Sequence, residues 1–458
     1  MSSLIGTLSI SLTALAAEQG ALEATANNVA NVNTPGYSRL VPVLVETPPA
    51  VVNSLTLGTG VSLARLQSVR DPILQLRIQE ETQQQGQLNA FVTGMQQAQV
   101  MFNSSSGGDI GTQLSNFFSS LSQLSTNPTD LATRQTVLTA AGNLANSFNN
   151  TANTLTTQRA NVDLEVVQAV QQINTLTTQI AQVNTQINAL QNVGRDASAF
   201  IDQRDVLVGQ LSSLIDVQQI KSDSSISLTT SSGTALVADQ QAFTLTTQQD
   251  ASGVQHIFAQ GQDITSQLSS GQLGGLIQVR DQKIPALLTS LDTLAAGLAN
   301  AFNTANQAGF DLNGNPGGNL FTPPPASGQG AASSMAVAIT DPSLIAASSD
   351  GTPGSNGNVS ALLAVHDQPL IAGQTPTDYY ANLVFGVGSD VSNGSAELSA
   401  SQLILQQLQD QRASISGVSL DEEAANLIQY QRAYEAAARV VDTASQMFAT
   451  LINMGVTP

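Results

Sequence analysis

The side chains best suited to catalysis are scarce in this chain. It contains two histidines, His256 and His366, and no cysteine. Neither histidine has a second metal ligand at a suitable spacing, and the sequence lacks a His-Glu-x-x-His helix, a Gly-rich phosphate loop and a Gly-x-Ser-x-Gly turn. His256 lies in a strand-like alternation and His366 stands beside Asp367, so we expect both to be ordinary polar residues. The sequence therefore predicts no catalytic residue, no cofactor and no metal ligand.

Two acidic clusters could be mistaken for sites. Asp311-Leu-Asn-Gly-Asn315 alternates oxygen-bearing side chains like the start of a calcium loop. Pro316 stands where an EF-hand needs glycine and Thr322 where it needs glutamate, so we expect a turn. In Asp202-Gln-Arg204-Asp205, helical geometry puts the two aspartates on one face and turns Arg204 away. We expect this second cluster to be the solvated start of a helix.

Charge and composition disfavour several classes of partner. The 458 residues carry 33 acidic and 14 basic side chains, and the net charge of −19 would repel phosphate backbones and anionic lipid. We therefore expect neither nucleic acid nor a membrane as a partner. No apolar run is long enough to predict a membrane span. The first basic residue is Arg39, so secretion would use a route without a cleaved signal.

Both ends of the chain carry large apolar residues seven apart, which is the period of a coiled-coil seam. The N-terminal seam consists of Met1, Leu8, Leu15, Leu22 and Val29. The C-terminal seam consists of Leu420, Leu427, Tyr434, Val441 and Phe448. The two segments are expected to be helices that pair, although seams of this period could equally cover the body of a globular domain.

Between the two ends, apolar residues at three- and four-residue steps predict long helices over Val162 to Leu190 and Leu287 to Ala305. The period changes to two from about Val217 to Phe258, where Asp250-Ala-Ser-Gly253 predicts a hairpin turn. Shorter helices are expected near residues 72–103, 110–125, 130–155, 198–215 and 397–414.

The predicted fold is mainly α with a small inserted β domain. Residues 1–40 and 416–458 are expected to form paired coiled-coil helices as an assembly region. Residues 41–215, 264–319 and 360–415 are expected to form a long-helix bundle as the middle domain. Residues 216–263 and 320–359 are expected to form a β-rich outer insert at the end opposite the termini.

Residues 27–39, Asn27-Asn-Val-Ala-Asn31-Val-Asn33-Thr-Pro-Gly36-Tyr37-Ser-Arg39, resemble the N-terminal signature of the axial proteins of the bacterial flagellum, which include rod, hook and first hook-associated proteins. Within this stretch, Pro35 and Gly36 predict a turn that ends the first helix, because proline blocks continuation and glycine permits positive φ. Residues 419–434 resemble the C-terminal helix of the hook-associated protein 1 branch. Hook and rod proteins typically have a Thr-Asn-Val-Asp-like segment where this chain has Gly417-Val-Ser-Leu-Asp421.

Two internal stretches, residues 201–207 and 291–314, resemble the same branch. The β insert is short for that branch, so an additional outer domain of larger members is expected to be missing.

The resemblance implies a structural, non-enzymatic subunit of the flagellum, placed outside the cell at the hook–filament junction and required for filament assembly and motility. It also implies export through the flagellar type III channel. The implied partners are further copies of the chain in a ring, the hook protein, hook-associated protein 3, the flagellar cap transiently, and an export chaperone at the C-terminal helix. The expected subunit-assembly residues are Leu8, Leu15, Leu22, Val29, Asn31, Asn33, Pro35, Gly36, Tyr37, Leu420, Leu427, Tyr434, Val441 and Phe448.

Three alternatives stay open at this point. The chain could be another axial protein: hook-associated protein 3 and flagellins do not normally show the Asn-Thr-Pro-Gly-Tyr signature, and hook and rod proteins differ before Asp421. It could be a flagellar subunit that carries an enzyme, which the absent zinc motif and the short insert disfavour. A surface adhesin would rest on the β insert alone.

Overall fold

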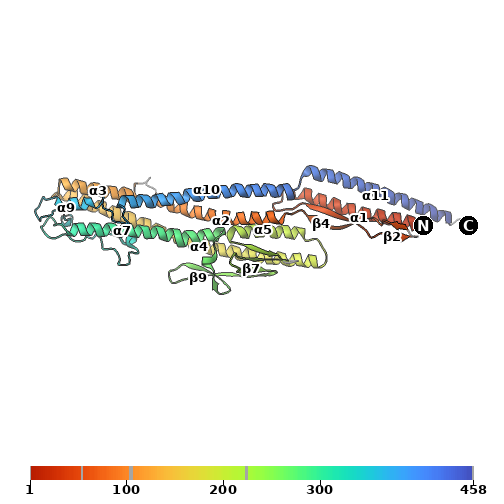
Figure 1. Cartoon of the computed structure of the whole chain (residues 1–458), viewed down its shortest axis with the longest axis horizontal. Coiled ribbons are helices and arrows are strands. Elements are labelled where there is room, and N and C mark those ends of the chain that lie inside the picture. The colour runs from red at the N-terminus through yellow and green to blue at the C-terminus, as the bar shows by residue number, and fades with distance from the viewer. Residues whose placement is uncertain (1, 53–54, 103–106, 222–224, 456–458) are drawn as a thin grey trace.

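The computed structural model describes residues 2–52, 55–102, 107–221 and 225–455, and it shows an elongated, mainly helical molecule. Both termini lie at one end, as Figure 1 shows. The predicted pairing of the terminal helices and the long helices of the middle are both confirmed. None of the described helices is long and apolar enough to cross a membrane.

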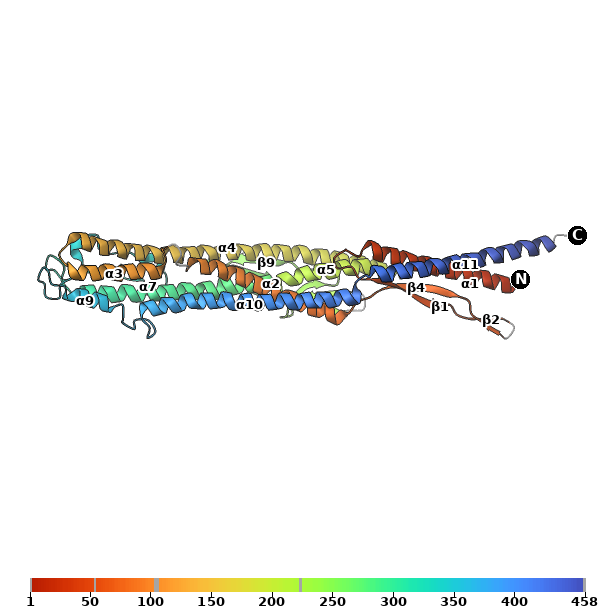
Figure 2. The same cartoon turned by 90° about the horizontal axis from the view of Figure 1, so that it is seen from above.

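The end that carries the termini is a terminal arm, in which the first and last helices run antiparallel beside a long hairpin (Figure 2). Strand β1 pairs antiparallel with β4 along α1, and the short strands β2 and β3 extend this hairpin. The terminal arm consists of α1 (Ser2–Ala30), the connection 31–39, β1 (Leu40–Glu46), β2 (Ala50–Val52), β3 (Leu55–Leu57), β4 (Val61–Ser68) and α11 (Leu420–Gly455).

The assignment of residues 41–68 to the helical middle domain was wrong. Residues 40–46, Leu-Val-Pro-Val-Leu-Val-Glu, combine three β-branched residues with a proline, and both features disfavour the interior of a helix. They form a strand whose pairing with β4 shifts register between Val43 and Leu44.

The helical body begins where the hairpin ends. Its main helices are α2 (Pro72–Met101), α3 (Ile110–Thr126), α4 (Leu131–Asn192), α5 (Ser198–Leu214), α6 (Gly271–Gln278), α7 (Ile284–Gln307) and α10 (Pro376–Ser416). The side chains of Asp71, Asp109 and Asp130 cap α2, α3 and α4 by accepting bonds from backbone N–H groups in the first turn. Helix α4 is one continuous helix of 62 residues, where the sequence analysis expected two segments.

One hydrophobic core runs through the body. Phe117 of α3, Phe302 of α7 and Phe321 pack edge to face, with ring centroids 4.9 Å and 5.8 Å from that of Phe117. Apolar residues of α4 from Val137 to Ile180 are buried in the same core. The core therefore extends along most of the length of α4.

Two small antiparallel sheets lie along the side of α4. The first has the strand order β5 (Gln218–Lys221), β6 (Ile226–Thr229), β7 (Ala235–Ala238), β8 (Gln241–Ala242). The second has the order β11 (Gln262–Asp263), β10 (Gln255–Ala259), β9 (Leu245–Gln249). The predicted hairpin turn at residues 250–253 is confirmed, because it joins the paired strands β9 and β10.

The expected β-rich insert at the far end is corrected in two respects. The two sheets lie beside the middle of the molecule rather than at its end (Figure 1). Residues 320–359, all of them described, form no named strand; they contain the short helix α8 (Ala331–Ser334) and the start of α9 (Gly357–Ala364). This segment is fixed at the far end by side-chain bonds instead: Asn303 of α7 bonds both the N–H and the carbonyl of Phe321.

Candidate functional site: the terminal arm and its junction with the body

Asn28, near the end of α1, is the centre of a buried hydrogen-bond network. Its Nδ2 donates to the carbonyl of Leu40 at 2.9 Å and to Oε2 of Glu423 at 3.1 Å. Its Oδ1 accepts from the N–H of Leu40 and from the hydroxyl of Tyr37, both at 2.8 Å. All four bonding positions of the amide are used. One side chain that is 1% exposed therefore holds α1, β1 and α11 together.

Arg39 connects this network to the last two helices. Its Nε donates to Glu423 at 2.8 Å, and its Nη1 donates to Glu422 at 2.6 Å. Its backbone N–H donates to the carbonyl of Ser416 at the end of α10. Because the Glu423 side chain is only 1% exposed, removing Arg39 would leave a buried charge without its partner.

Ser38 fixes the connection to the body. Its N–H and hydroxyl donate to the Asp202 carboxylate at 3.1 and 2.7 Å, and Arg70 donates to the same carboxylate at 2.7 Å. The expectation that residues 202–205 form a solvated helix start was wrong, because Asp202 and Arg204 are both buried. The connection 31–39 and the start of α2 cover this part of α5. The prediction that Asp202 and Asp205 share a face is confirmed, since Arg70 pairs with both.

Gly36 and Tyr37 belong to the same junction. Gly36 has a φ of +83°, and a Cβ at this position would lie 2.3 Å from Cγ2 of Val206, so the predicted glycine turn is confirmed. Arg412 of α10 donates to the Gly36 carbonyl at 2.7 Å. Burial, followed by the nearby charges of Asp202, Glu423 and Asp196, raises the pKa of Tyr37 to about 12. Tyr37 is therefore a neutral hydroxyl that donates to Asn28.

The remaining predicted residues of the signature form the turn itself. Asn31 bonds to Asn27 and accepts from the hydroxyl of Thr34, while Asn33 and Pro35 are exposed. A role for Asn31, Asn33 and Pro35 in contacts between subunits stays a prediction.

The seams agree only in part with the contact between α1 and α11. Leu8, Leu15 and Leu22 are half-buried and Val29 is exposed; Met1 lies outside the described residues. The most deeply buried apolar residues of α1 are Ala17, Ala21 and Ala24. Helix α1 packs against both α11 and the β1–β4 hairpin, so small side chains are needed where the backbones approach closely. A Cβ on Gly20, for example, would lie 2.4 Å from Leu63 of β4.

The C-terminal seam shows the same pattern. Leu427, Val441 and Phe448 are half-buried, whereas Leu420 and Tyr434 are exposed. Ala444 is the one apolar residue of α11 that is fully buried among those whose side chains are described. The large apolar residues thus flank the helix pair, and their role in assembly stays a prediction.

Sequence reasoning missed the polar residues of the junction. These are Asn28, Ser38, Arg39, Arg70, Arg412 and Glu423, together with the buried role of Asp202. Three of them lie inside the signature stretch and Glu423 lies inside the C-terminal stretch, so membership of a motif was the available signal for these four; Arg70 and Arg412 lie in neither stretch. Which of them pair across almost 400 residues was not evident from either motif.

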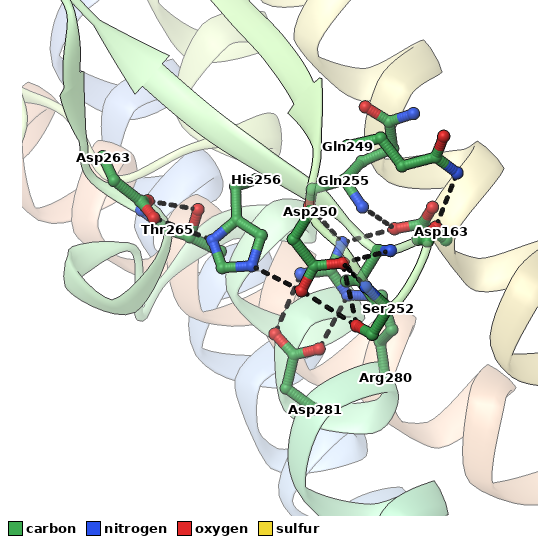
Figure 3. Close-up of polar contacts among 12 residues, drawn as sticks. Asp163, Gln249, Asp250, Ser252, Gln255, His256, Asp263, Thr265, Arg280 and Asp281 are labelled. Atoms are coloured by element: carbon green, nitrogen blue, oxygen red, sulfur yellow. Dashed lines mark hydrogen bonds and ion pairs between the residues drawn. The ribbon is translucent and has the colours of Figure 1, made fainter.

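The two histidines lie outside this junction and are fully explained by local bonds. His256 contacts Asp263 at 2.7 Å and Asp250 at 3.6 Å, next to the buried Arg280, which pairs with Asp163 at 2.6 Å (Figure 3). His366 pairs with Asp367 at 2.6 Å.

The described residues contain no group of three or more acidic, histidine or cysteine side chains that could hold a metal ion. Asp311 caps its own loop by accepting from the N–H groups of Asn313 and Asn315, which confirms the predicted turn.

Comparison with known proteins covers both the arm and the body. Residues 95–321 match the model of the flagellar hook-associated protein FlgK helical domain. Residues 8–37 match the flagella basal body rod protein model, and residues 409–454 match the flagellar basal body rod FlgEFG protein C-terminal model. The chain is 29% identical to flagellar hook-associated protein 1 of Bacillus subtilis (strain 168), with 97% of each chain covered. The chain belongs to the flagellar hook-associated protein 1 family.

One further relative supports the same family, and one solved structure shows the same fold. Flagellar hook-associated protein 1 of Escherichia coli (strain K12) is 28% identical, with 99% of this chain and 100% of the relative covered. The flagellar hook junction protein FlgK from Burkholderia pseudomallei has the same fold, with a TM-score of 0.67 at 19% identity over 74% of this chain and 100% of that one. The E. coli alignment runs over 554 positions, more than the 458 residues of this chain, so that relative contains segments that this chain lacks.

The comparisons confirm the predicted family and its structural, non-enzymatic class. The two short matches coincide with α1 plus the connection and with the end of α10 plus α11. The two paired helices of the terminal arm therefore match the rod-protein models, and residues 95–321 of the body match the helical-domain model of the hook-associated protein.

Proposed function

We propose that this chain is an extracellular structural subunit of the hook–filament junction, and that it polymerises through its terminal arm. The family supplies the place in the flagellum. The structure supplies the observation that carries the role of the arm: its helices pair, yet they leave much of their apolar surface uncovered.

The apolar surface of the arm is large for its size. Among the described residues, more than half of the exposed large apolar side chains belong to it. They are Ile5, Ile10, Leu12, Val29, Val41, Leu44, Val45, Val51, Leu420, Ile428, Tyr434, Val440, Met447, Leu451 and Ile452. The buried hydrophobic clusters of the described chain contain no residue of α1, of the hairpin or of α11. A surface of this kind is typical of an element that neighbouring subunits cover.

The proposed partners follow from the family and from the exposed apolar surface of the terminal arm. Copies of the chain would form a ring through the arm, with the hook protein on one side and hook-associated protein 3 on the other, and the flagellar cap would bind transiently. The second half of α11 is the proposed site for an export chaperone, because Val440, Met447 and Leu451 are exposed there. The two sheets lie on the side of the body opposite α10 (Figure 1), which supports an outward-facing role for them.

The test is complementation of a strain of the source bacterium that lacks this gene. We expect the deletion to leave hooks without filaments and flagellin in the medium, and the full chain to restore swimming. Replacing Leu427 and Val441 by aspartate should abolish restoration, since both side chains would place a charge at the helix pair in every subunit.

Removal of residues 217–262, with a short Gly/Ser linker, is the matched control and should still restore filaments. Electron microscopy of the hooks reads out each strain. Normal filaments in the Leu427→Asp Val441→Asp strain, or in the strain that lacks the whole gene, would contradict the proposal.

A further inference from the structure

A cavity of about 220 Å³ lies where the terminal arm meets the body. Its walls come from six parts of the chain that the fold brings together: Ser38 of the connection, the start of α2 after Arg70, the end of α4, α5 at Arg204, strands β5 and β6, and the end of α10 at Arg412. Such a volume lies below the roughly 300–1,000 Å³ of sites for drug-sized ligands, so the space suits a small ion or functional group.

The charge of the cavity wall is opposite to that of the protein. Four of the 14 basic residues line it, namely Arg70, Arg204, Arg412 and Lys221, in a chain whose net charge is −19. Two carboxylates line it as well. Asp71 is already occupied as the cap of α2, and Asp205 lies 3.7 Å from Arg70. Asp202, which is not part of the wall, pairs with Arg70 at 2.7 Å, so the four cations face three carboxylates and a small surplus of positive charge remains.

Arg204 is the most deeply buried of these cations. It is 6% exposed, and its Nη1 donates to Asn184 at 3.2 Å. Its Nε is buried and has no hydrogen-bond partner among the residues that the structure describes. A buried donor without an acceptor is unfavourable, and a guanidinium presents its N–H groups in a fork that matches two oxygens of an oxyanion.

We propose that this cavity binds a small oxyanion, and that the bound anion braces the terminal arm against the body. The anion accepts from the free Nε–H of Arg204 and offsets the charge of Arg412, which, unlike Arg70, forms no ion pair with the described residues. Arg412 already holds the carbonyl of Gly36, and Arg70 holds Asp202, which binds Ser38. An anion between these guanidinium groups therefore connects α5 and α10 to the connection 31–39. The chemistry fits a free inorganic anion or the carboxylate of an acidic side chain from a neighbouring subunit.

The test titrates the full-length chain with sodium phosphate or sodium acetate at constant ionic strength, with sodium chloride as the reference salt. Binding is followed by calorimetry and by the melting temperature. We expect a saturable rise in melting temperature with one of the two anions and none with chloride. Saturation by phosphate identifies a free inorganic anion, whereas saturation by acetate alone identifies a carboxylate from another subunit.

Two variants and one control locate the site. Arg204→Gln and Arg412→Gln should each weaken anion binding about tenfold or more, because each removes one charged group that holds the anion. Arg412 is partly exposed and does not depend on the burial of Arg204, which keeps the test valid if Arg204→Gln fails to fold. Arg195→Gln removes an exposed arginine outside the cavity and should bind as the unaltered chain does.

Hydrogen exchange provides the readout of bracing. The saturating anion should slow exchange at residues 36–40 and 416–418 of the unaltered chain and not of the Arg412→Gln variant. The proposal is overturned if neither phosphate nor acetate saturates, if chloride acts equally, or if both cavity variants bind as tightly as the Arg195→Gln control.

Discussion

Replacing Asn28 by alanine should loosen the junction of the arm without unfolding the body. The change removes the partner of four groups at once: the N–H and carbonyl of Leu40, the hydroxyl of Tyr37 and one oxygen of Glu423. A buried polar group that loses its partner costs about 1–3 kcal/mol. Tyr37 is partly exposed and Glu423 keeps its bond to Arg39, so we count only the two buried backbone groups of Leu40 and expect a loss of about 3 kcal/mol.

Hydrogen exchange measured residue by residue is the direct assay. Since each 1.4 kcal/mol corresponds to about a tenfold change, the amides of Arg39 and Leu40 should exchange about a hundredfold faster, through local opening of the junction. Amides of α4 around Ile173 should keep their rates, because they belong to the core of the body.

Asn27→Ala is the matched control, because Asn27 is exposed on the same turn and its side chain bonds only to Asn31 among the contacts of the described chain. The reasoning fails if Leu40 exchanges at the unaltered rate in the Asn28 variant, or if the Asn27 variant accelerates it equally.

Three further outcomes follow from the same arm. Glu423→Gln should destabilise the junction by about 3 kcal/mol, because Arg39 loses a buried partner; in a double-mutant cycle measured by denaturant unfolding, Arg39→Gln with Glu423→Gln should cost less than the sum of the single changes. Burial raises the pKa of Glu18 of α1, whose Oε2 has no partner among the described residues. The folded arm therefore favours the neutral carboxyl. The stability that this carboxyl contributes is fully present below the ordinary pKa of Glu18 and is lost as pH rises through the raised pKa. Glu18→Gln should therefore protect the arm from proteolysis at pH 7 and bring no gain at pH 4, while the exposed Glu23→Gln should do neither. Gly36→Ala should cost about 2 kcal/mol or more of stability, because the position has a positive φ and the new Cβ clashes with Val206. Adding Val206→Ala should recover only the part of this stability that the clash costs. Full recovery in thermal unfolding would refute the assigned backbone strain.

Periodicity predicted most of the helices because their apolar faces are regular and long. Val162 to Leu190 and Leu287 to Ala305 both lie within helices of the structure, and the change of period at Val217 marks the start of the sheets. It failed at residues 41–68, where the hairpin packs on only one side and half of the large apolar side chains that the structure describes are exposed.

The detailed contacts of the arm were beyond reach for a different reason. A seam of leucines seven apart predicted pairing, yet the closest contacts use Ala17, Ala21 and Ala24, because a third element packs against α1. Alanine carries little periodic signal of its own. The Asn28–Glu423 and Ser38–Asp202 bonds join residues far apart in sequence, and only the folded chain reveals such pairs.

Helix α4 has a mechanical consequence. At 1.5 Å per residue its 62 residues form a rod about 93 Å long. The rod runs from the far end of the body to the junction with the terminal arm (Figure 2). Bending this rod would break helical bonds and separate packed side chains at the same time. The junction, by contrast, is crossed by three non-helical connections, at residues 31–39, 69–71 and 417–419. A torque transmitted along the polymer should therefore leave the body straight and concentrate its strain at the junction. There the stiffness of the molecule depends on a few directional polar bonds.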